Sequence, residues 1–240
     1  MSSSAATSST SSAATAACSS VSFLAPPPKS MPLPDAQPAQ VVREYGPFAG
    51  ADTIHGVTHD GQRVWAAVGE RILAIDPASG ETTAQVAHAA DAGTAFDGTY
   101  LYQIADGHIQ KVDPSSGEIL STIPAPGGEC VSGMAWAEGS LWVGAYRDRK
   151  IHQVDPGTGK VLRTIDSNRY VTGVTWVDGE LWHGTWEDGR SDLRRVDPAT
   201  GAMLERLDMP AGKEVSGLEW DGAGRFYCGG GNTEVVRAVW

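Results

Sequence analysis

The sequence of 240 residues is poor in cysteine and in patterns that bind metal ions. Its three cysteines, Cys18, Cys130 and Cys228, stand far apart and match neither a zinc motif nor a disulfide framework. Such usage is typical of a reducing compartment, so we expect the protein in the cytoplasm. The six histidines are scattered, with no cluster of carboxylates beside them, and we therefore expect neither a metal ion nor another cofactor.

Lysine and arginine form no run, and the formal net charge at pH 7 is -11. Nucleic-acid binding requires a clustered basic surface, and binding to an anionic membrane draws on the same kind of charge. The chain also contains no apolar stretch of the ~20 residues that a membrane-spanning helix needs. These absences exclude nucleic acids and membranes as expected partners.

Aromatic residues are almost missing from residues 1–39, which are rich in Ser, Ala, Thr and Pro. Such a composition buries too little apolar surface to offset the entropy of ordering, so this segment is predicted to be a disordered extension. It lacks the basic and apolar regions of a secretory signal. Its Ser-rich, acid-poor start is shared with organelle transit peptides, although its low Arg content is not, and organelle targeting stays an alternative location.

Residues 40–240 contain a repeated unit. Four copies of its turn are "AIDPASG", "KVDPSSG", "QVDPGTG" and "RVDPATG", which recur with a period of roughly 40 residues. In each copy Asp caps the turn, Pro fixes φ, and Gly takes a positive-φ position before the next strand. An acidic residue followed by Gly marks a second turn in each unit and a fifth one at Asp221-Gly222. Four antiparallel strands per unit, repeated five times, predict an all-β, five-bladed β-propeller.

A glycine occurs near the start of every predicted inner strand, at Gly56, Gly93, Gly133, Gly173 and Gly217. Inner strands crowd around the axis of a propeller, so we expect these positions to leave no room for a side chain. Aromatic residues follow three positions later in four of the units, at Phe96, Trp136, Trp176 and Trp220. We expect these rings to pack between neighbouring blades.

The fifth unit ends at Trp240 after only three strands. Upstream of the first unit, "QVVREYG" is similar to the outer strand of the other units. Residues about 40–46 are therefore predicted to pair with the strand around Val235–Val239 as the outer strand of the last blade. This pairing closes the ring and removes an open sheet edge.

The two faces of the predicted propeller differ in sequence. One face carries the repeated Asp-Pro and acidic-Gly turns, which we call the turn face. The other, the loop face, carries connections of varied sequence, and varied loops on a rigid scaffold often form binding sites. The binding residues predicted from these loops are Glu129, Tyr146, Arg147, Arg169 and Trp186.

The third position of the second strand holds Ala66, Gln103, Val143, His183 and Cys228 in the five units. Polar residues are unexpected at a packing position, so Gln103 is a further candidate for binding. His183 and Cys228 belong to neighbouring blades, and a Cys–His pair can activate a thiolate for catalysis; the alternative is that both residues only pack. His55, at the start of the first inner strand, is expected to face the axis and is a third catalytic candidate.

The unit "GVTWVDGELWHGTWEDGRSDLRRVDPATGAML" resembles the repeats of the plant and bacterial type of glutaminyl-peptide cyclotransferase, over about residues 40–240. Parts of the pattern are also similar to streptogramin lyases. The resemblance implies a five-bladed propeller that forms pyroglutamate, in which a substrate α-amine attacks its own side-chain amide and ammonia leaves. That reaction uses a carboxylate as a proton shuttle. The family's Glu on the second strand is replaced here by Cys228, and Glu219 lies nearer the turn face, so cyclisation is expected to be absent or weak.

We therefore expect a monomeric propeller with a pocket for a small molecule or a peptide terminus on the loop face. Three functions stay open: glutamine cyclisation, another lyase, hydrolase or isomerase reaction in the same axial pocket, and ligand binding without catalysis. Buried polar groups bonded to one another beneath the pocket would favour catalysis. An aromatic rim without such a cluster would favour binding.

Overall fold

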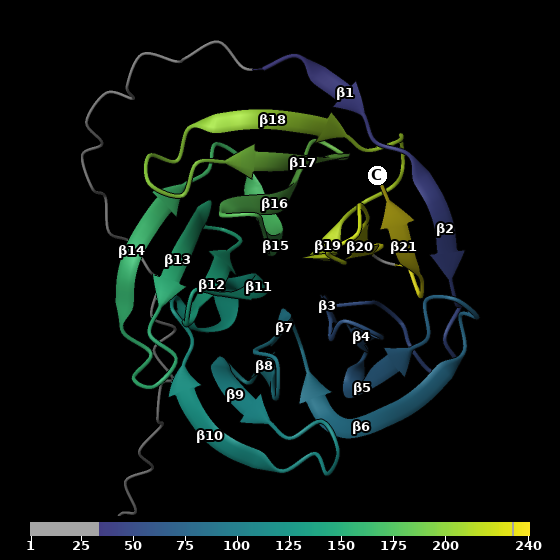
Figure 1. The fold of residues 1–240 in the computed structure, drawn as a ribbon. Helices are drawn as coiled ribbons and strands as arrows, with labels where there is room; N and C mark the ends of the chain where they lie inside the picture. The colour runs from purple at the N-terminus through teal and green to yellow at the C-terminus, as the bar shows by residue number, and fades with distance from the viewer. Residues whose placement is uncertain (1–33, 232) are drawn as a thin grey trace, which may run out of the picture. The chain divides into compact units, whose positions relative to one another are not determined.

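The computed structural model describes residues 34–231 and 233–240, with the backbone alone for Glu129. Their strands form five sheets that stand in a ring around a central axis (Figure 1). The predicted fold, an all-β propeller of five blades, is confirmed. Within these residues, no helix has the length and apolar character needed to cross a membrane.

Each blade runs from an inner strand beside the axis to an outer strand at the rim (Figure 1). The inner strands are β3 (Gly56–His59), β7 (Thr94–Phe96), β11 (Val131–Ala137), β15 (Tyr170–Val177) and β19 (Ser216–Trp220). The second strands are β4 (Val64–Ala67), β8 (Leu101–Ala105), β12 (Ser140–Ala145), β16 (Glu180–Glu187) and β20 (Phe226–Gly229). The third strands are β5 (Gly69–Ile75), β9 (His108–Val112), β13 (Lys150–Val154), β17 (Arg190–Val196) and β21 (Val236–Val239). The outer strands are β6 (Thr82–Ala90), β10 (Ile119–Pro124), β14 (Val161–Asp166), β18 (Met203–Asp208) and β2 (Val41–Tyr45).

The turns of the repeat have the predicted chemistry. In the first blade the Asp76 carboxylate accepts a hydrogen bond from the Ala78 N–H at 2.8 Å, and Gly80 has φ of 87°. In the fourth blade Asp197 accepts the Ala199 N–H at 2.7 Å, and Gly201 has φ of 73°. Each Asp thus fixes its own turn, and Gly supplies the backbone conformation that other residues avoid.

The ring closes as predicted, because β2 is the outer strand of the fifth blade. It pairs antiparallel with β21, with Val41 opposite Val239 and Tyr45 opposite Val236. Gln40 and Trp240 exchange two further backbone hydrogen bonds, at 2.9 and 3.1 Å. Strand β2, from the start of the propeller sequence, is therefore joined to β21, the last strand of the chain. Together they complete the fifth blade and leave no open edge between the two ends of the ring.

Residues 1–39 were predicted to be a disordered extension. Residues 1–33 of it lie outside the described part of the chain, and the prediction is wrong for residues 36–38. Residues Ala36–Pro38 form β1, a fifth strand that pairs parallel with β18 at the rim of the fourth blade. The Ala39 N–H continues this pairing to Asp208 O at 2.9 Å. Pro38 has no backbone N–H to donate, and proline is tolerated on an edge strand whose N–H is not needed.

The inner glycines crowd the axis as expected. A Cβ atom added to Gly173 would lie 2.6 Å from the carbonyl carbon of Gly217, and one on Gly93 would lie 2.6 Å from that of Gly133. A Cβ on Gly56 would likewise meet Ala92 O at 2.5 Å. No side chain fits at such distances, so these glycines form a tight ring that narrows the axis between the two faces.

The hydrophobic core is divided into five buried clusters, and each lies between two neighbouring blades. The aromatic residues of the inner strands take part in this packing. Trp136 stacks on Tyr102 of the preceding blade with ring centroids 5.3 Å apart, and Trp176 stacks on Trp142 at 5.4 Å. The prediction that these rings pack between blades is therefore confirmed, and the blades form a rigid support for the loop face.

Candidate functional site

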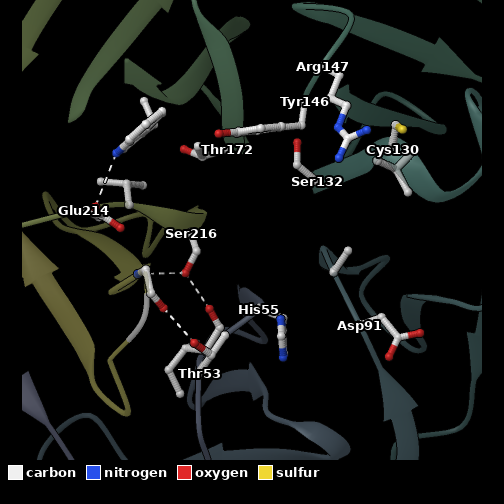
Figure 2. A pocket seen from close by; sticks show the side chains of 16 residues that line it. Thr53, His55, Asp91, Cys130, Ser132, Tyr146, Arg147, Thr172, Glu214 and Ser216 are labelled. Carbon is white, nitrogen blue, oxygen red and sulfur yellow. Dashed lines mark hydrogen bonds between the residues drawn. The ribbon is translucent and has the colours of Figure 1, made fainter. Parts of the chain in front are cut away.

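A cavity of about 660 Å³ lies on the loop face, directly above the ring of inner glycines. All five blades contribute to its lining (Figure 2). The residues come from two sets of loops: those that lead into the inner strands and those that join the second strands to the third strands. We call this space the axial cavity.

The floor of the axial cavity is formed by the residues that precede the glycines, namely His55, Ala92, Ser132, Thr172 and Ser216. The Ser132 hydroxyl donates to Val171 O at 2.7 Å, and the Ser216 hydroxyl donates to Ile54 O. These two hydroxyls therefore join neighbouring blades through backbone carbonyls. Among the described residues, the buried Thr172 hydroxyl oxygen has no hydrogen-bond partner.

Asp91 and His55 lie near each other at the edge of this floor, on neighbouring blades (Figure 2). Burial lowers the pKa of the His55 imidazole below its ordinary value, and the negative charge of Asp91 opposes this shift. The Asp91 carboxylate also accepts the backbone N–H of Asp106 at 3.0 Å, which fixes its orientation. His55 lines the axial cavity, in agreement with the prediction that it faces the axis.

Three aromatic side chains, Tyr146, Tyr170 and Trp186, form what we call the aromatic wall. The Tyr146 and Tyr170 rings stack with centroids 4.8 Å apart, and the Tyr170 and Trp186 centroids are 6.2 Å apart. Tyr146 and Trp186, two of the residues predicted to bind a ligand, line the axial cavity. The Trp186 indole N–H donates to the Glu214 carboxylate at 3.3 Å and so connects the wall to an acidic group of the cavity.

Of the two predicted arginines, only Arg147 lines the axial cavity, where it is exposed at the mouth. Arg169 is not part of the cavity lining. Its guanidinium pairs with the buried Asp192 carboxylate at 3.0 Å and donates to the carbonyls of Glu187 and Arg190 at 3.0 and 2.8 Å. These bonds hold both terminal nitrogens of the guanidinium, so its position assigns Arg169 to the support of the loops and not to ligand contact.

Gln103 is fully buried in the second blade and is not part of the cavity lining. Its amide nitrogen donates to Ala92 O at 3.1 Å and to Ile104 O at 2.9 Å, and its amide oxygen accepts the Thr94 hydroxyl. The amide thus satisfies backbone groups below the floor. This explains a polar residue at a packing position without a role in ligand contact.

His183 and Cys228 are also buried in the blades and outside the cavity lining. Burial lowers the pKa of His183 to about 4, and burial raises the pKa of Cys228 to about 12, although the Arg237 charge opposes the second shift. Both directions disfavour the charged forms that a thiolate–imidazolium pair requires. Both shifts oppose the catalytic hypothesis for this pair, and packing accounts for Cys228. The buried Nδ1 of His183 has no hydrogen-bond partner among the described residues, so packing alone does not explain a histidine there.

The prediction for Glu129 stays a prediction, because only its backbone, in the short 3-10 helix η1 (Gly128–Cys130), is described. Sequence reasoning missed Asp91. The position two residues before each inner glycine is Ile54, Asp91, Val131, Val171 and Val215, so Asp91 is the only polar member of an apolar column. This polar residue in an otherwise apolar column was the signal in the sequence that could have identified Asp91 as a candidate site residue. Within the described part of the chain, no three His, Cys, Asp or Glu side chains gather as a metal site.

The fold and the position of the cavity define the class of the protein as a five-bladed β-propeller with an axial cavity on one face. Neither a family model nor a curated protein matches the chain. Among solved structures it is similar to the glutaminyl cyclase of Myxococcus xanthus, with a TM-score of 0.69 and 17% identity over 85% of this chain and 97% of that chain. The computationally designed Ika8 protein matches with a TM-score of 0.47 and 19% identity over 78% of this chain and 57% of that one. The resemblance inferred from the repeats is confirmed for the fold.

Proposed function

We propose that the axial cavity binds a small polar molecule that carries an amine, or the amino terminus of a peptide. The observation that carries this proposal is the distribution of charge around the cavity: Asp91 and Glu214 stand on different sides of it, and Arg147 is at its mouth (Figure 2). Two carboxylates favour a ligand amine, and the guanidinium favours a ligand carbonyl or carboxylate.

The aromatic wall supports binding more than catalysis. Tyr146 and Trp186 give the cavity a rigid apolar side on which a ligand can pack, at a low cost in side-chain entropy. The hydroxyls of Ser132 and Ser216 are engaged with backbone carbonyls and not with one another. A shuttle of protons through the floor would need polar side chains bonded in sequence, so binding without catalysis is the first choice.

Calorimetric titration with a short peptide amide that begins with Gln tests this function. We expect the peptide with a free amino terminus to bind at least ~10-fold more tightly than its N-acetyl form. This ratio corresponds to a difference of about 1.4 kcal/mol in the free energy of binding. Glu214→Gln and Asp91→Asn should each weaken binding of the free-amine peptide. Glu118→Gln, an exposed acidic position on the turn face, is the matched control and should leave the affinity unchanged. Equal affinity for the free and acetylated peptides would overturn the proposal.

A second candidate is acid–base catalysis by His55 with Asp91, which the charge of Asp91 acting on His55 favours. The solved glutaminyl cyclase of similar fold makes a Gln-initiated peptide the first substrate to try. We expect no release of ammonia above background, because no carboxylate occupies the second-strand position of the family pattern. Turnover that His55→Ala and Asp91→Asn both abolish, and that Cys228→Ala leaves intact, would establish the second candidate.

A further inference from the structure

The hydroxyl groups around the axial cavity are arranged to accept hydrogen bonds from a ligand. Three hydroxyls of the lining each donate their hydrogen to a backbone carbonyl: Thr53 to Gly231, Ser132 to Val171, and Ser216 to Ile54. A hydroxyl group carries a single hydrogen, so any bond between these three groups and a ligand is one that the protein accepts. These positions therefore favour a ligand with donors of its own.

The charged side chains of the lining have the same bias. An ionised carboxylate only accepts hydrogen bonds, and Asp91 and Glu214 stand on different sides of the cavity (Figure 2). The Trp186 indole N–H already donates to Glu214 at 3.3 Å. Burial lowers the pKa of His55, which is therefore neutral at pH 7. Arg147, exposed at the mouth, is the one charged donor among the described lining residues. The lining thus fits a ligand that is cationic and rich in donors.

The aromatic wall gives the axial cavity a flat side. Tyr170 is outside the lining and stacks on Tyr146 with an angle of 17° between the ring planes. One face of the Tyr146 ring is thus covered, and the opposite face is left for a ligand (Figure 2). The face of an aromatic ring is negative, so it attracts groups of partial positive charge, such as C–H groups on carbon atoms bonded to oxygen. A ligand that matches the wall is flat and presents such C–H groups together.

We propose that the axial cavity binds an amino sugar, a pyranose ring that carries a free amine. The inference rests on the proposed function and narrows its ligand from any small amine to one chemical class. A pyranose has a hydroxyl group on most of its carbon atoms, and its axial C–H bonds point to the two faces of the ring. The sugar hydroxyls donate to the acceptors of the lining, one face of the sugar stacks on Tyr146, and the ammonium group pairs with a carboxylate. The cavity volume of about 660 Å³ lies within the roughly 300–1,000 Å³ that small-molecule sites occupy.

Four probes test this inference by calorimetry: glucosamine, glucose, N-acetylglucosamine and glutamine amide. We expect glucosamine to bind at least ~10-fold more tightly than each of the other three. Glucose lacks the amine, acetylation removes its charge, and glutamine amide has the amine without the sugar ring. In nuclear magnetic resonance spectra of glucosamine, the ring protons should also move upfield when the protein is added, because protons above an aromatic face are shielded.

Variants of Tyr146 test the stacking. Tyr146→Leu keeps an apolar side chain and removes the aromatic face, so it should weaken glucosamine binding ~10-fold and change the affinity for glutamine amide little. Tyr146→Phe retains the ring and should keep the preference for glucosamine. Tyr100→Leu, in the turn-face hairpin of the second blade, is the matched control and should leave both affinities unchanged. Thermal unfolding of each variant checks that the fold is intact.

Failure of the inference can be told apart from failure of the proposed function. If glutamine amide binds and Glu214→Gln weakens it, but glucosamine binds no more tightly, the inference is overturned while the proposed function stands. Unchanged glucosamine affinity in Tyr146→Leu, or ring-proton resonances that do not move, would likewise overturn the inference alone. If glucosamine and glucose bind equally, or if no probe binds, an amine is not recognised and the proposed function falls together with the inference.

Discussion

The turn face and the loop face of this propeller are built on opposite principles. On the turn face Asp76 and Asp197, more than a hundred residues apart in sequence, make the same hydrogen bond two residues ahead. On the loop face the equivalent floor positions of the five blades hold His, Ala, Ser, Thr and Ser. Repetition therefore accompanies the scaffold, and variation accompanies the cavity. Changes to repeated positions should cost stability, and changes to varied positions should cost binding.

The axis shows the same difference at its two ends. Beyond the ring of glycines, away from the axial cavity, the Glu219 carboxylate accepts hydrogen bonds from Thr58 at 2.8 Å and Thr175 at 2.6 Å. This end is filled by groups bonded to one another, whereas the loop-face end is open. Glu219 is not among the residues of the axial cavity, which agrees with its predicted place nearer the turn face.

The largest effect should follow from opening the scaffold. Deleting residues 1–46 removes β1 and β2, and with β2 the outer strand of the fifth blade. We expect the free energy of unfolding to fall by several kcal/mol, a large share of the stability of a single domain. Deleting residues 1–35 keeps both strands and should leave chemical denaturation curves nearly unchanged. Equal losses in the two truncations would show that closure of the ring does not stabilise the fold.

A smaller loss is expected from crowding the axis. Gly173→Ala places a Cβ atom 2.6 Å from the backbone of Gly217, and no flexible side chain is there to move aside. Overpacking of this kind should lower the free energy of unfolding by roughly 3 kcal/mol. Gly157→Ala, on the turn face, meets only Asp155 at 3.5 Å and is the matched control. A Gly173 variant as stable as the Gly157 variant would contradict the tight ring of glycines.

Glu219 should make stability depend on pH. Burial raises its pKa from 4.5 to about 7, while the Thr175 and Thr58 hydroxyls oppose the shift. The folded state then binds more protons than the unfolded state, so the contribution is fully present below pH 4.5 and is lost as pH rises to about 7. Because the Glu219 side chain is partly accessible to solvent, we expect this contribution to the free energy of unfolding to be about 2 kcal/mol. Glu219→Gln should therefore be stabilised relative to wild type at pH 8 and not at pH 4.5; parallel curves would refute the assignment.

The smallest effect concerns Cys228. Its thiol is fully buried and its pKa is raised to about 12, whereas Cys130 is partly exposed in the axial cavity. Of these two thiols, iodoacetamide should label Cys130 first and Cys228 only after unfolding, with His183→Ala making no difference. Rapid labelling of Cys228 in mildly acidic buffer, lost in His183→Ala, would restore the catalytic pair and weaken the contrast between scaffold and cavity.

The fold was predictable because its signals are local and repeated. Turn residues such as Asp76 and Gly80 determine backbone geometry within a few positions, and four copies of the pattern leave little ambiguity. Strand β1 was missed because a short edge strand containing Pro38 gains its stability from pairing with β18, which local composition does not record. Its pairing partner is distant in sequence, so only the assembled blade explains it.

The site was less predictable, because it depends on where side chains meet. The loops that provide Tyr146, Arg147 and Trp186 were identified from their variation alone. Gln103 and Arg169 were predicted as ligand contacts because the sequence does not show that both already bond to protein groups, Gln103 to backbone carbonyls and Arg169 to Asp192. The thiolate hypothesis for Cys228 depended on solvent access, a property of five packed blades and not of any single strand.

Mapping the bound ligand by nuclear magnetic resonance tests the central claim that function resides on the loop face. Backbone amide shifts should be recorded while a short peptide amide that begins with Gln is titrated into the full chain. The account predicts that shifts concentrate in residues 53–55, 91–92 and 214–216 around the axial cavity, with the turn-face hairpins unchanged. Shifts confined to the Asp-Pro or acidic-Gly turns, or no shifts at saturating peptide, would contradict it.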